Sequence, residues 1–600
     1  MRMFKRYPRR PLSRLAFTIV LTAAFTASLC GRAGAAQPDF GSNVIVFDPS
    51  MPVSQIQTTL DGIATQQVDN EFGTQRYALL FKPGTYGSVA QPLTFQVGYY
   101  TEVAGLGASP GDVTINGHID VYNRCLSPNN CIALVNFWRS LSNLTINVMG
   151  LSGCRASGDF WAVSQAASMR RVNISGGNLT LMDYCTAGPQ FASGGFIADS
   201  QTGFVINGAQ QQFLVRNSDI GGWSNGVWNQ VFSGVTGAPA QSFPNPPYTT
   251  LAASPVTREK PYLYVDGSGN FKVFVPAVQH NSTGTSWGGG ATPGSSIPIT
   301  KFFIAKPTDS AAAINHALDM GMNLILTPGV YSLDRTLRVM RADTVVLGLG
   351  FPTLVPQHGI VSMQTGRAQG IMISGIIFDA GTTKSPALLV VGLGRAHVDP
   401  ADPSGLHDVF FRIGGATPGK ALASLVVNGD NVILDNVWAW RADHGNGVGW
   451  SSNPADFGVV VSGDNVTAYG LFVEHYQKYE VFWSGNGGTD IFFQNEMPYD
   501  VPDQASWMEA RGVNGWAAFK VAGCVKSFTG YGMGSYSNFS QPVFAANAFE
   551  VPTALPSGSL HDVFTLFLGG QGGISNVING TGGSATAANP DVVVPVLSYP

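Results

Sequence analysis

The feature that most constrains the fold of this 600-residue chain is an internal repeat. Residues 78–107 read ALLFKPGTYGSVAQPLTFQVGYYTEVAGLG, and residues 323–350 read NLILTPGVYSLDRTLRVMRADTVVLGLG. Both segments place a Pro-Gly-x-Tyr turn before a Gly-Leu-Gly triplet, and a helical pattern precedes each of them. A repeat of this length and order predicts two copies of one domain.

Within each copy, short runs of alternating apolar residues recur at intervals of about 20–30 residues. Examples are LSNLTINV (141–148) and MRRVNISG (169–176) in the first copy, and NVILDNVWAW (431–440) in the second. Glycine is abundant, at 73 residues, and only 12% of residues are charged, which favours extended β architecture over helices. We therefore predict an all-β fold of two tandem right-handed parallel β-helices, of the pectin-lyase type, packed side by side. Two β-sandwiches are the alternative, and the Pro-Gly-x-Tyr turn disfavours them.

Composition along the chain predicts five segments. A Pro-rich stretch followed by a hairpin pattern around DGSGN (266–270) separates the two copies, and we expect this connector to hold them together. A cleft between adjacent β-helices would form a natural ligand groove. The predicted segments are a signal peptide (1–35), an N-terminal β-helix (36–235), a connector (236–300), a C-terminal β-helix (301–570) and a C-terminal tail (571–600).

The first 35 residues have the pattern of an export signal. A basic stretch precedes the apolar run LAFTIVLTAAFTASL, and AGA (33–35) fits a cleavage site. The pair Arg9 and Arg10 points to a twin-arginine route, whereas Leu29 before Cys30 disfavours a lipoprotein. We expect a secreted protein, extracellular or periplasmic.

Net charge limits the class of partner. Removing residues 1–35 takes away seven basic residues and no acidic ones, so the net charge changes from −4 to −11. Nucleic acids and anionic membranes repel a chain this acidic, so we expect neither of them as a partner. We expect a neutral substrate, no cofactor or metal, and a monomer.

Five cysteines remain after the predicted cleavage. An exported chain permits disulfides, and we expect the pairs Cys125–Cys131 and Cys154–Cys185, with Cys524 free. No Cys-x-x-Cys spacing occurs, so a zinc site is not expected. G-x-G-x-x-G and H-E-x-x-H are also absent from the sequence, so we expect neither a dinucleotide-binding protein nor a zinc protease. We also expect no G-x-S-x-G nucleophile elbow of the serine-hydrolase kind, because none of the matches to that pattern lies between a predicted strand and a predicted helix.

Two glutamates are candidate catalytic residues. Glu474 and Glu496 are 22 residues apart, close to one coil of a β-helix, and adjacent coils lie about 4.8 Å apart. Two carboxyl groups this close cannot both ionise easily, so the pKa of one rises. A carboxylic acid that stays protonated near neutral pH is what a glycosidase needs to protonate a leaving oxygen. The alternative is that both glutamates face solvent on an ordinary strand.

Residues near these glutamates are candidates for sugar contacts. Aromatic faces stack on sugar rings, and charged groups hydrogen-bond their hydroxyls. Each candidate also has a structural alternative: the aspartate could bond its own backbone in a turn, and the tryptophans could be core residues. The candidates are Trp440, Asp443, His444, Tyr476, Gln477, Lys478 and Trp483.

Several longer motifs carry a family resemblance. The repeated turn units, WRADHG (440–445), LFVEHYQKYEVFWSGNGG (471–488), FFQNEMPYD (492–500) and the earlier FWAVSQA and SGGFIADS resemble glycoside hydrolase family 55 over about residues 40–570. The resemblance implies a β-1,3-glucanase of the laminarinase kind, exo-acting and inverting. It also implies Glu496 as general acid, Glu474 as a second site carboxylate, and Gln165 and Ser193 as holders of the attacking water. Gln211 and Ser218 compete for that last role.

Two other functions fit a β-helix. A polysaccharide lyase acting on uronates would need clustered aspartates for Ca²⁺, which the strands do not show, and the acidic surface would repel the substrate. A non-catalytic carbohydrate-binding or adhesin-like protein would keep the aromatic residues but would not need a close pair of glutamates.

Overall fold

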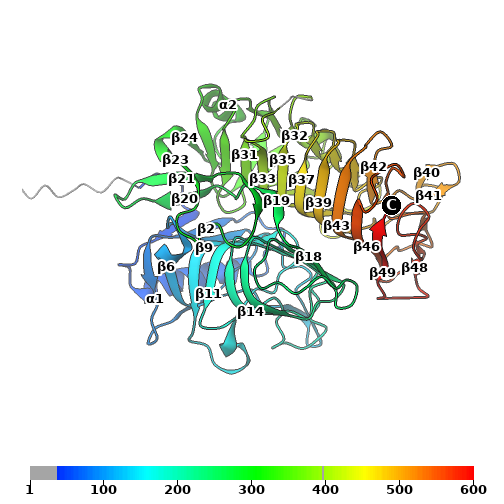
Figure 1. Ribbon diagram of the computed structural model, residues 1–600. Helices are drawn as coiled ribbons and strands as arrows, with labels where there is room; N and C mark the ends of the chain where they lie inside the picture. Colours follow the sequence, from blue (N-terminus) through cyan, green and yellow to red (C-terminus); the bar gives the residue numbers. More distant parts are fainter. Residues whose placement is uncertain (1–36, 395–397) are drawn as a thin grey trace, which may run out of the picture. The chain divides into compact units, whose positions relative to one another are not determined.

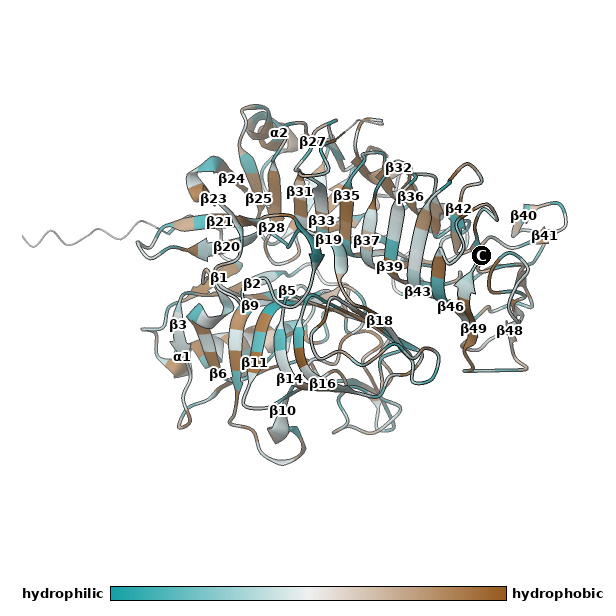
Figure 2. Ribbon diagram, viewed as in Figure 1, coloured by the Kyte–Doolittle hydropathy of each residue, from teal (hydrophilic) through white to brown (hydrophobic). Residues whose placement is uncertain are grey.

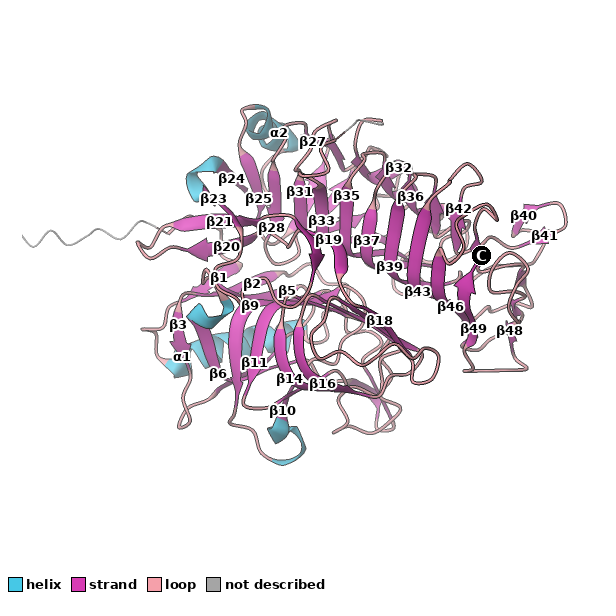
Figure 3. Ribbon diagram, viewed as in Figure 1, coloured by secondary structure: helices cyan, strands magenta, loops and turns pink. Residues whose placement is uncertain are grey.

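The computed structural model describes residues 37–394 and 398–600, so the predicted signal peptide lies outside the described residues. Two ladders of parallel strands dominate the described part (Figures 1 and 3). The path through the N-terminal ladder is β1 (Val44–Phe47), β2 (Tyr77–Phe81), β5 (Thr101–Gly105), β9 (Arg139–Val148), β11 (Ala167–Ser175), β13 (Phe196–Ala198), β15 (Gln212–Arg216), β17 (Asn229–Ser233) and β18 (Tyr248–Leu251).

The C-terminal β-helix shows the coil architecture more regularly, because two of its faces are continuous sheets. The first runs through β24 (Phe302–Ala305), β25 (Asn323–Leu326), β28 (Val345–Gly348), β31 (Met372–Asp379), β33 (Ser404–Ile413), β35 (Val432–Arg441), β37 (Thr467–Glu474), β39 (Gly488–Glu496), β43 (Phe528–Ser537), β46 (Leu560–Phe567) and β49 (Val594–Tyr599). The second runs through β27 (Leu337–Val339), β30 (Met363–Thr365), β32 (Ser385–Val391), β34 (Ala421–Val427), β36 (Phe457–Val461), β38 (Val481–Trp483), β42 (Phe519–Val521) and β45 (Phe549–Glu550). The predicted all-β fold of two parallel β-helices is confirmed.

The repeated tyrosine has the same structural role in both copies. The hydroxyls of Tyr86 and Tyr331 are buried, and each donates to two backbone carbonyls, those of Phe47 and Lys82 and those of Ala305 and Thr327 respectively. In each copy one acceptor lies on the first strand of the ladder and the other directly precedes the Pro-Gly pair. The turn motif therefore fastens the second coil to the first. The predicted helices also form, as α1 (Val53–Gln67) and α2 (Ala311–Asp319).

A column of left-handed residues crosses the first sheet of the C-terminal β-helix. The strand register aligns one such residue on each of seven neighbouring strands. A left-handed residue interrupts the alternation of side chains, so Leu434 and Val437 both enter the core of the β-helix, although they are three positions apart. Trp438 and Trp440 consequently face the N-terminal β-helix. The column consists of Gly375, Asp408, Asn436, Gly470, Phe492, Gly532 and Asp562.

Each β-helix has its own apolar core, and further apolar clusters lie between the two. Hydrophobic residues accordingly recur along the strands of both ladders (Figure 2). The connector forms β20 (Tyr262–Val265), β21 (Phe271–Pro276) and β23 (Gly294–Pro298), an antiparallel sheet in which the hairpin expected at residues 266–270 joins β20 to β21. Leu263 and Val273 of this sheet pack with Leu80 of the N-terminal β-helix and Leu347 of the C-terminal one. The connector therefore belongs to the contact between the two β-helices.

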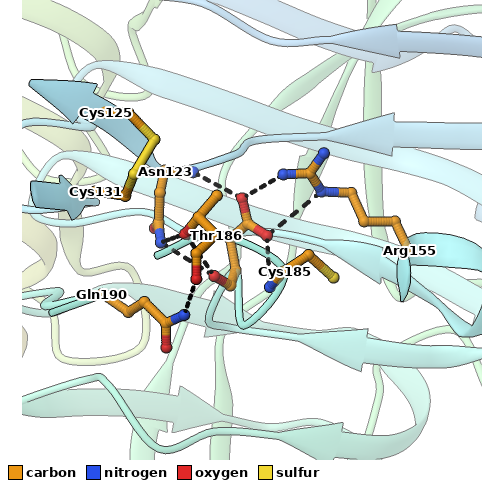
Figure 4. The surroundings of a disulfide bond; sticks show 8 residues. Asn123, Cys125, Cys131, Arg155, Cys185, Thr186 and Gln190 are labelled. Carbon is orange, nitrogen blue, oxygen red and sulfur yellow. Dashed lines mark hydrogen bonds and ion pairs between the residues drawn. A yellow bond between two sulfur atoms is a disulfide. The ribbon is translucent and has the colours of Figure 1, made fainter. Parts of the chain in front are cut away.

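Both predicted disulfides are present, Cys125–Cys131 and Cys154–Cys185, and Cys524 is a free, exposed thiol. Figure 4 shows that Thr186 links the neighbouring loops, since Asn123 Nδ2 donates to its hydroxyl and Gln190 Nε2 to its carbonyl. Among the described residues no helix is long and apolar enough to cross a membrane.

Candidate active site

A pocket of about 940 Å³ opens between the two β-helices and takes residues from both. Its size lies within the range of small-molecule and sugar sites. The N-terminal β-helix contributes loops between its strands, and the C-terminal one contributes the ends of β35, β37 and β39 and the segments that follow them. The lining includes Phe137, Gln165, Ser193 and Gln211 of the N-terminal β-helix, and Trp438, Trp440, Asp443, His444, Glu474, His475, Glu496 and Tyr499 of the C-terminal β-helix.

The two glutamates lie on neighbouring strands, as their spacing predicted. Phe472 of β37 pairs with Gln494 of β39, and the same offset of 22 residues sets Glu474 beside Glu496. Glu474 is buried, with one carboxylate oxygen accepting from Gln165 Nε2 and the other from Trp438 Nε1, both at 2.8 Å. Burial and then the charge of Glu496 raise the pKa of Glu474 well above its usual range.

Glu474 is also the link to the N-terminal β-helix. Ser193 Oγ donates to Gln165 Oε1 at 2.7 Å, and the amide nitrogen of the same glutamine donates to Glu474. Gln494 Nε2 donates to the backbone carbonyl of Ser193, which fixes the serine loop against β39. The chain Ser193–Gln165–Glu474 therefore crosses from one β-helix to the other at the floor of the pocket.

The structure also distinguishes between Gln211 and Ser218, the two alternative residues for holding the attacking water. Gln211 lines the pocket, and its side-chain oxygen has no hydrogen-bond partner among the described residues. Ser218 is buried inside the N-terminal β-helix, where its hydroxyl donates to the carbonyl of Arg216. Of these two, only Gln211 can reach a bound molecule.

Glu496 is the more accessible acid, with 16% of its side chain exposed. The Tyr499 hydroxyl donates to its Oε2, and His475 Nε2 lies 3.8 Å from the same oxygen. Burial raises the pKa of Glu496, and the positive charge of His475 and the Tyr499 hydrogen bond oppose this rise in part. Two adjacent carboxyl groups with raised pKa values titrate as a pair and release their protons at higher pH than isolated carboxyl groups do.

His444 lines the pocket and lies between two carboxylates. Its Nδ1 lies 2.8 Å from Asp443 Oδ1, and its Nε2 lies 2.8 Å from Glu71 Oε1 of the N-terminal β-helix. Burial disfavours the imidazolium, but the hydrogen bonds to Asp443 and Glu71 outweigh it and raise the pKa of His444 to about 10. Burial likewise opposes ionisation of Asp443, and the bond to His444 lowers the pKa of that carboxyl to about 2. His444 and Asp443 therefore form an ion pair at neutral pH.

Aromatic rings form the wall beside Glu474. The ring centroids of the stacked Trp438 and Trp440 are 5.2 Å apart, and that of Phe137 lies 4.8 Å from that of Trp438. The ring of Phe72 is parallel to that of Trp440, with the centroids 6.4 Å apart. Trp440 was expected here, whereas Trp438 was not. The sequence carried the signal, because the W-A-W alternation places both tryptophans on one face of β35.

Four of the expected sugar contacts are wrong. Tyr476 and Trp483 are fully buried in the core of the C-terminal β-helix, where Tyr476 shares a hydrogen bond with Ser424. Gln477 Nε2 donates to the Trp450 carbonyl, and Lys478 pairs with Asp456 at 2.9 Å, so both side chains are used outside the pocket. For Tyr476, Gln477 and Lys478 the physical reason is His475, whose φ of 69° turns the chain away from the pocket after that residue. Trp483 lies on β38, in the second sheet of the C-terminal β-helix.

Sequence reasoning missed Glu71, Phe137 and Tyr499. Tyr499 follows Glu496 closely in NEMPYD, so a turn after β39 could have brought it back to the acid. Glu71 and Phe137 carry no such local signal, because their partners lie hundreds of positions away in the sequence.

Comparisons with known proteins agree with this geometry. Residues 302–496 match the model of the LAM55 pectate lyase-like domain. An exo-beta-1,3-glucanase of Streptomyces sp. (strain SirexAA-E / ActE) is 46% identical over 99% of this chain and 97% of its own. The structure of sacteLam55A from Streptomyces sp. SirexAA-E superposes with a TM-score of 0.87 at 46% identity, covering 94% of this chain and 99% of that one. A variant of sacteLam55A in complex with glucose gives a TM-score of 0.86 at the same identity, covering 94% of this chain and all of its own. The chain therefore belongs to glycoside hydrolase family 55, the β-1,3-glucanase family that its motifs resemble.

Proposed function

We propose that this protein is a secreted exo-acting, inverting β-1,3-glucan hydrolase with Glu496 as general acid. The observation that carries the proposal is the hydrogen-bonded chain Ser193–Gln165–Glu474, which sets polar groups of one β-helix beside the acid of the other. The relatives support the substrate class, since one is an exo-beta-1,3-glucanase and the structure of another was solved with glucose.

Glu496 is suited to protonate the leaving oxygen. It is the more exposed member of a pair that cannot both ionise, and both oxygens of Glu474 already accept N–H donors, an arrangement that favours the ionised form there. We therefore assign the shared proton to Glu496 before the reaction. Donation to the glycosidic oxygen leaves Glu496 as the carboxylate.

Inversion requires water on the face of the sugar opposite the acid. Two carboxyl groups on adjacent strands are too close together to enclose both a sugar and that water. Ser193 Oγ and the Gln165 amide instead offer positions for the water from the N-terminal β-helix. The proton that the water loses would pass through the Ser193 hydroxyl and the Gln165 amide to Glu474, so the glutamate pair holds the same number of protons before and after hydrolysis.

Exo action is supported by the contact that joins the two β-helices at His444. The His444–Asp443–Glu71 trio and the parallel rings of Phe72 and Trp440 block the chain beyond the first sugar. A glucan would then enter with its non-reducing end at this wall. Its remaining sugars would extend toward Trp228 and Phe191 at the other side of the pocket.

Export is supported by the two disulfides, which persist in oxidising compartments. The predicted signal peptide, the monomeric state and the exclusion of nucleic acid stay predictions.

Product analysis on laminarin tests the proposal. We expect glucose as the initial product, released as the α-anomer and followed by proton NMR before mutarotation. Mixed oligosaccharides would contradict exo action, and β-glucose would contradict inversion. Lack of any product from laminarin, with turnover of a different glycan, would overturn the substrate assignment.

A further inference from the structure

We propose that the N-terminal β-helix holds one divalent metal ion of the Zn²⁺ class between His118, Asp120 and Asp159. β6 (Val113–Asp120) carries the first two residues, and β10 (Gly158–Phe160) carries the third. One ligand atom from each residue lies within 4.8 Å of the others, and no other such group of acids, histidines or cysteines occurs among residues 37–394 and 398–600. None of the three lines the active-site pocket.

His118 is the strongest indication of a ligand. Its side chain is fully buried, and neither ring nitrogen makes a hydrogen bond of normal geometry in the described part of the chain; the Gly158 backbone makes only a weaker contact with the ring. Buried polar atoms are almost always paired, because burial removes the hydrogen bonds that they make to water. The Nδ1 atom lies 3.9 Å from Asp120 Oδ2, so the imidazole faces the carboxylate without bonding to it. A metal ion between them would satisfy a ring nitrogen.

Hydrogen bonds from neighbouring groups fix the orientation of both aspartate carboxyl groups, as is common for metal ligands. Asp159 Oδ1 accepts from the Ile119 amide at 2.9 Å, while its Oδ2 is buried without a partner among the described residues. Asp120 accepts from the Phe160 amide at 2.8 Å and from the Tyr122 hydroxyl at 2.5 Å. Outer hydrogen bonds of this kind fix the orientation of ligating carboxylates.

The lack of a basic partner for the two aspartates also favours a bound cation. Among the described residues no lysine or arginine lies within ion-pair distance of Asp120 or Asp159. Nearby Asp183, by contrast, pairs with Arg155 at 2.8 Å. Two buried carboxyl groups beside an unpartnered imidazole form a site that a bound cation would neutralise.

The ligand types select the ion. One imidazole nitrogen and two carboxylate oxygens suit Zn²⁺, whereas Ca²⁺ and Mg²⁺ prefer oxygen ligands alone. The 3.9 Å between Nδ1 and Oδ2 is slightly wider than the spacing of about 3.3 Å between two ligands of tetrahedral Zn²⁺. Because all three side chains are buried, the ion would be enclosed as β6 and β10 assemble, and its role would be to stabilise the coils.

Metal analysis of the full chain tests the site. The protein is produced without a histidine tag in Zn²⁺-supplemented medium, dialysed against EDTA and examined by plasma mass spectrometry. We expect about one zinc per chain in the parent and less than about one tenth of that in Asp159→Asn. X-ray absorption on the parent should show nitrogen and oxygen ligands at about 2.0–2.1 Å, with an imidazole signature and no sulfur.

Asp490→Asn is the matched control. Asp490 is also fully buried without a partner among the described residues, but it lies on β39 with no imidazole in a shared cluster. This variant should keep the zinc, and circular dichroism checks that each variant is folded. Zinc-free parent protein, zinc retained by Asp159→Asn, or a sulfur shell would overturn the proposal. If Asp159→Asn does not fold, the metal content and absorption spectrum of the parent decide.

Discussion

Two groups of buried carboxylates lie between the β-helices, and they differ in their partners. In the first group, Arg170 of the N-terminal β-helix reaches Asp408 at 2.9 Å and Asp435 at 2.8 Å, and Arg216 reaches Asp435 at 3.0 Å. Burial alone would raise the pKa values of these aspartates, but the guanidinium charges outweigh it and hold both below the usual range. These acids are permanently ionised and join the two halves.

The second group, Glu474 and Glu496, has no lysine or arginine within ion-pair distance among the described residues. Its neighbours are an amide, an indole, a phenol and an imidazole, and both pKa values are raised. Burial would raise the pKa values of the acids in both groups, but only the group without a guanidinium partner shows raised values. An arginine makes a buried acid structural, and the absence of one leaves it able to exchange a proton.

The largest expected effect follows from removing the exchangeable proton. Glu496→Gln should lower kcat on laminarin about 10³-fold, because an amide cannot protonate the leaving oxygen. Glucose release measures this, and thermal unfolding shows that the fold is kept. An aryl β-glucoside with an acidic phenol as leaving group should lose much less activity. A variant that retains a tenth of the activity would remove Glu496 from the role.

Breaking the structural group should instead affect stability. Arg216→Met leaves Glu259 without its arginine and Asp435 with only Arg170, and should lower the free energy of unfolding by about 3–5 kcal/mol. Because the pKa of Asp435 is lowered in the folded state, the loss is present above the ordinary aspartate range and shrinks as pH falls below about 4. Denaturant unfolding at neutral and acidic pH measures both.

The control for this variant is Arg335→Met, whose ion pair with Asp334 is exposed. It should leave unfolding unchanged, since exposed pairs contribute little. Equal destabilisation by the two variants would contradict the contrast between the buried and the exposed pairs.

A smaller effect is expected across the interface. Gln165→Ala removes the amide that joins Ser193 to Glu474, and misplacing the water should lower kcat about 10²-fold. Gln211→Ala, in the same pocket, should cost less than about tenfold. A larger loss of kcat in Gln211→Ala than in Gln165→Ala would instead assign the water site to Gln211.

The smallest effect concerns the pH profile. Activity should fall as pH rises through the raised pKa of Glu496, because the acid must be protonated. The Tyr499 hydrogen bond favours the ionised form, so Tyr499→Phe should move the alkaline limb of kcat/KM upward by about one pH unit. Tyr531→Phe, outside the pocket, should leave the limb in place. A downward shift in Tyr499→Phe would contradict the assignment.

The sequence predicted what depends on local repetition. The coil spacing paired Glu474 with Glu496, the repeated turns identified two β-helices, and the cysteine spacing gave both disulfides. It failed where a single backbone angle reverses alternation, as at His475, which sends Tyr476 into the core. It also could not give contacts between the two copies, such as Arg170 with Asp435, because no short-range pattern encodes them.

The last strand has a consequence for the behaviour of the molecule in concentrated solution. β49 runs antiparallel to β46, whereas the ladder before it is parallel, and Pro595 interrupts its hydrogen-bonding capacity. An open end of such a ladder would offer its bare backbone to another molecule and allow growth into filaments. Because β49 covers that edge with an antiparallel strand, it opposes such growth, so a protein built by repetition stays finite.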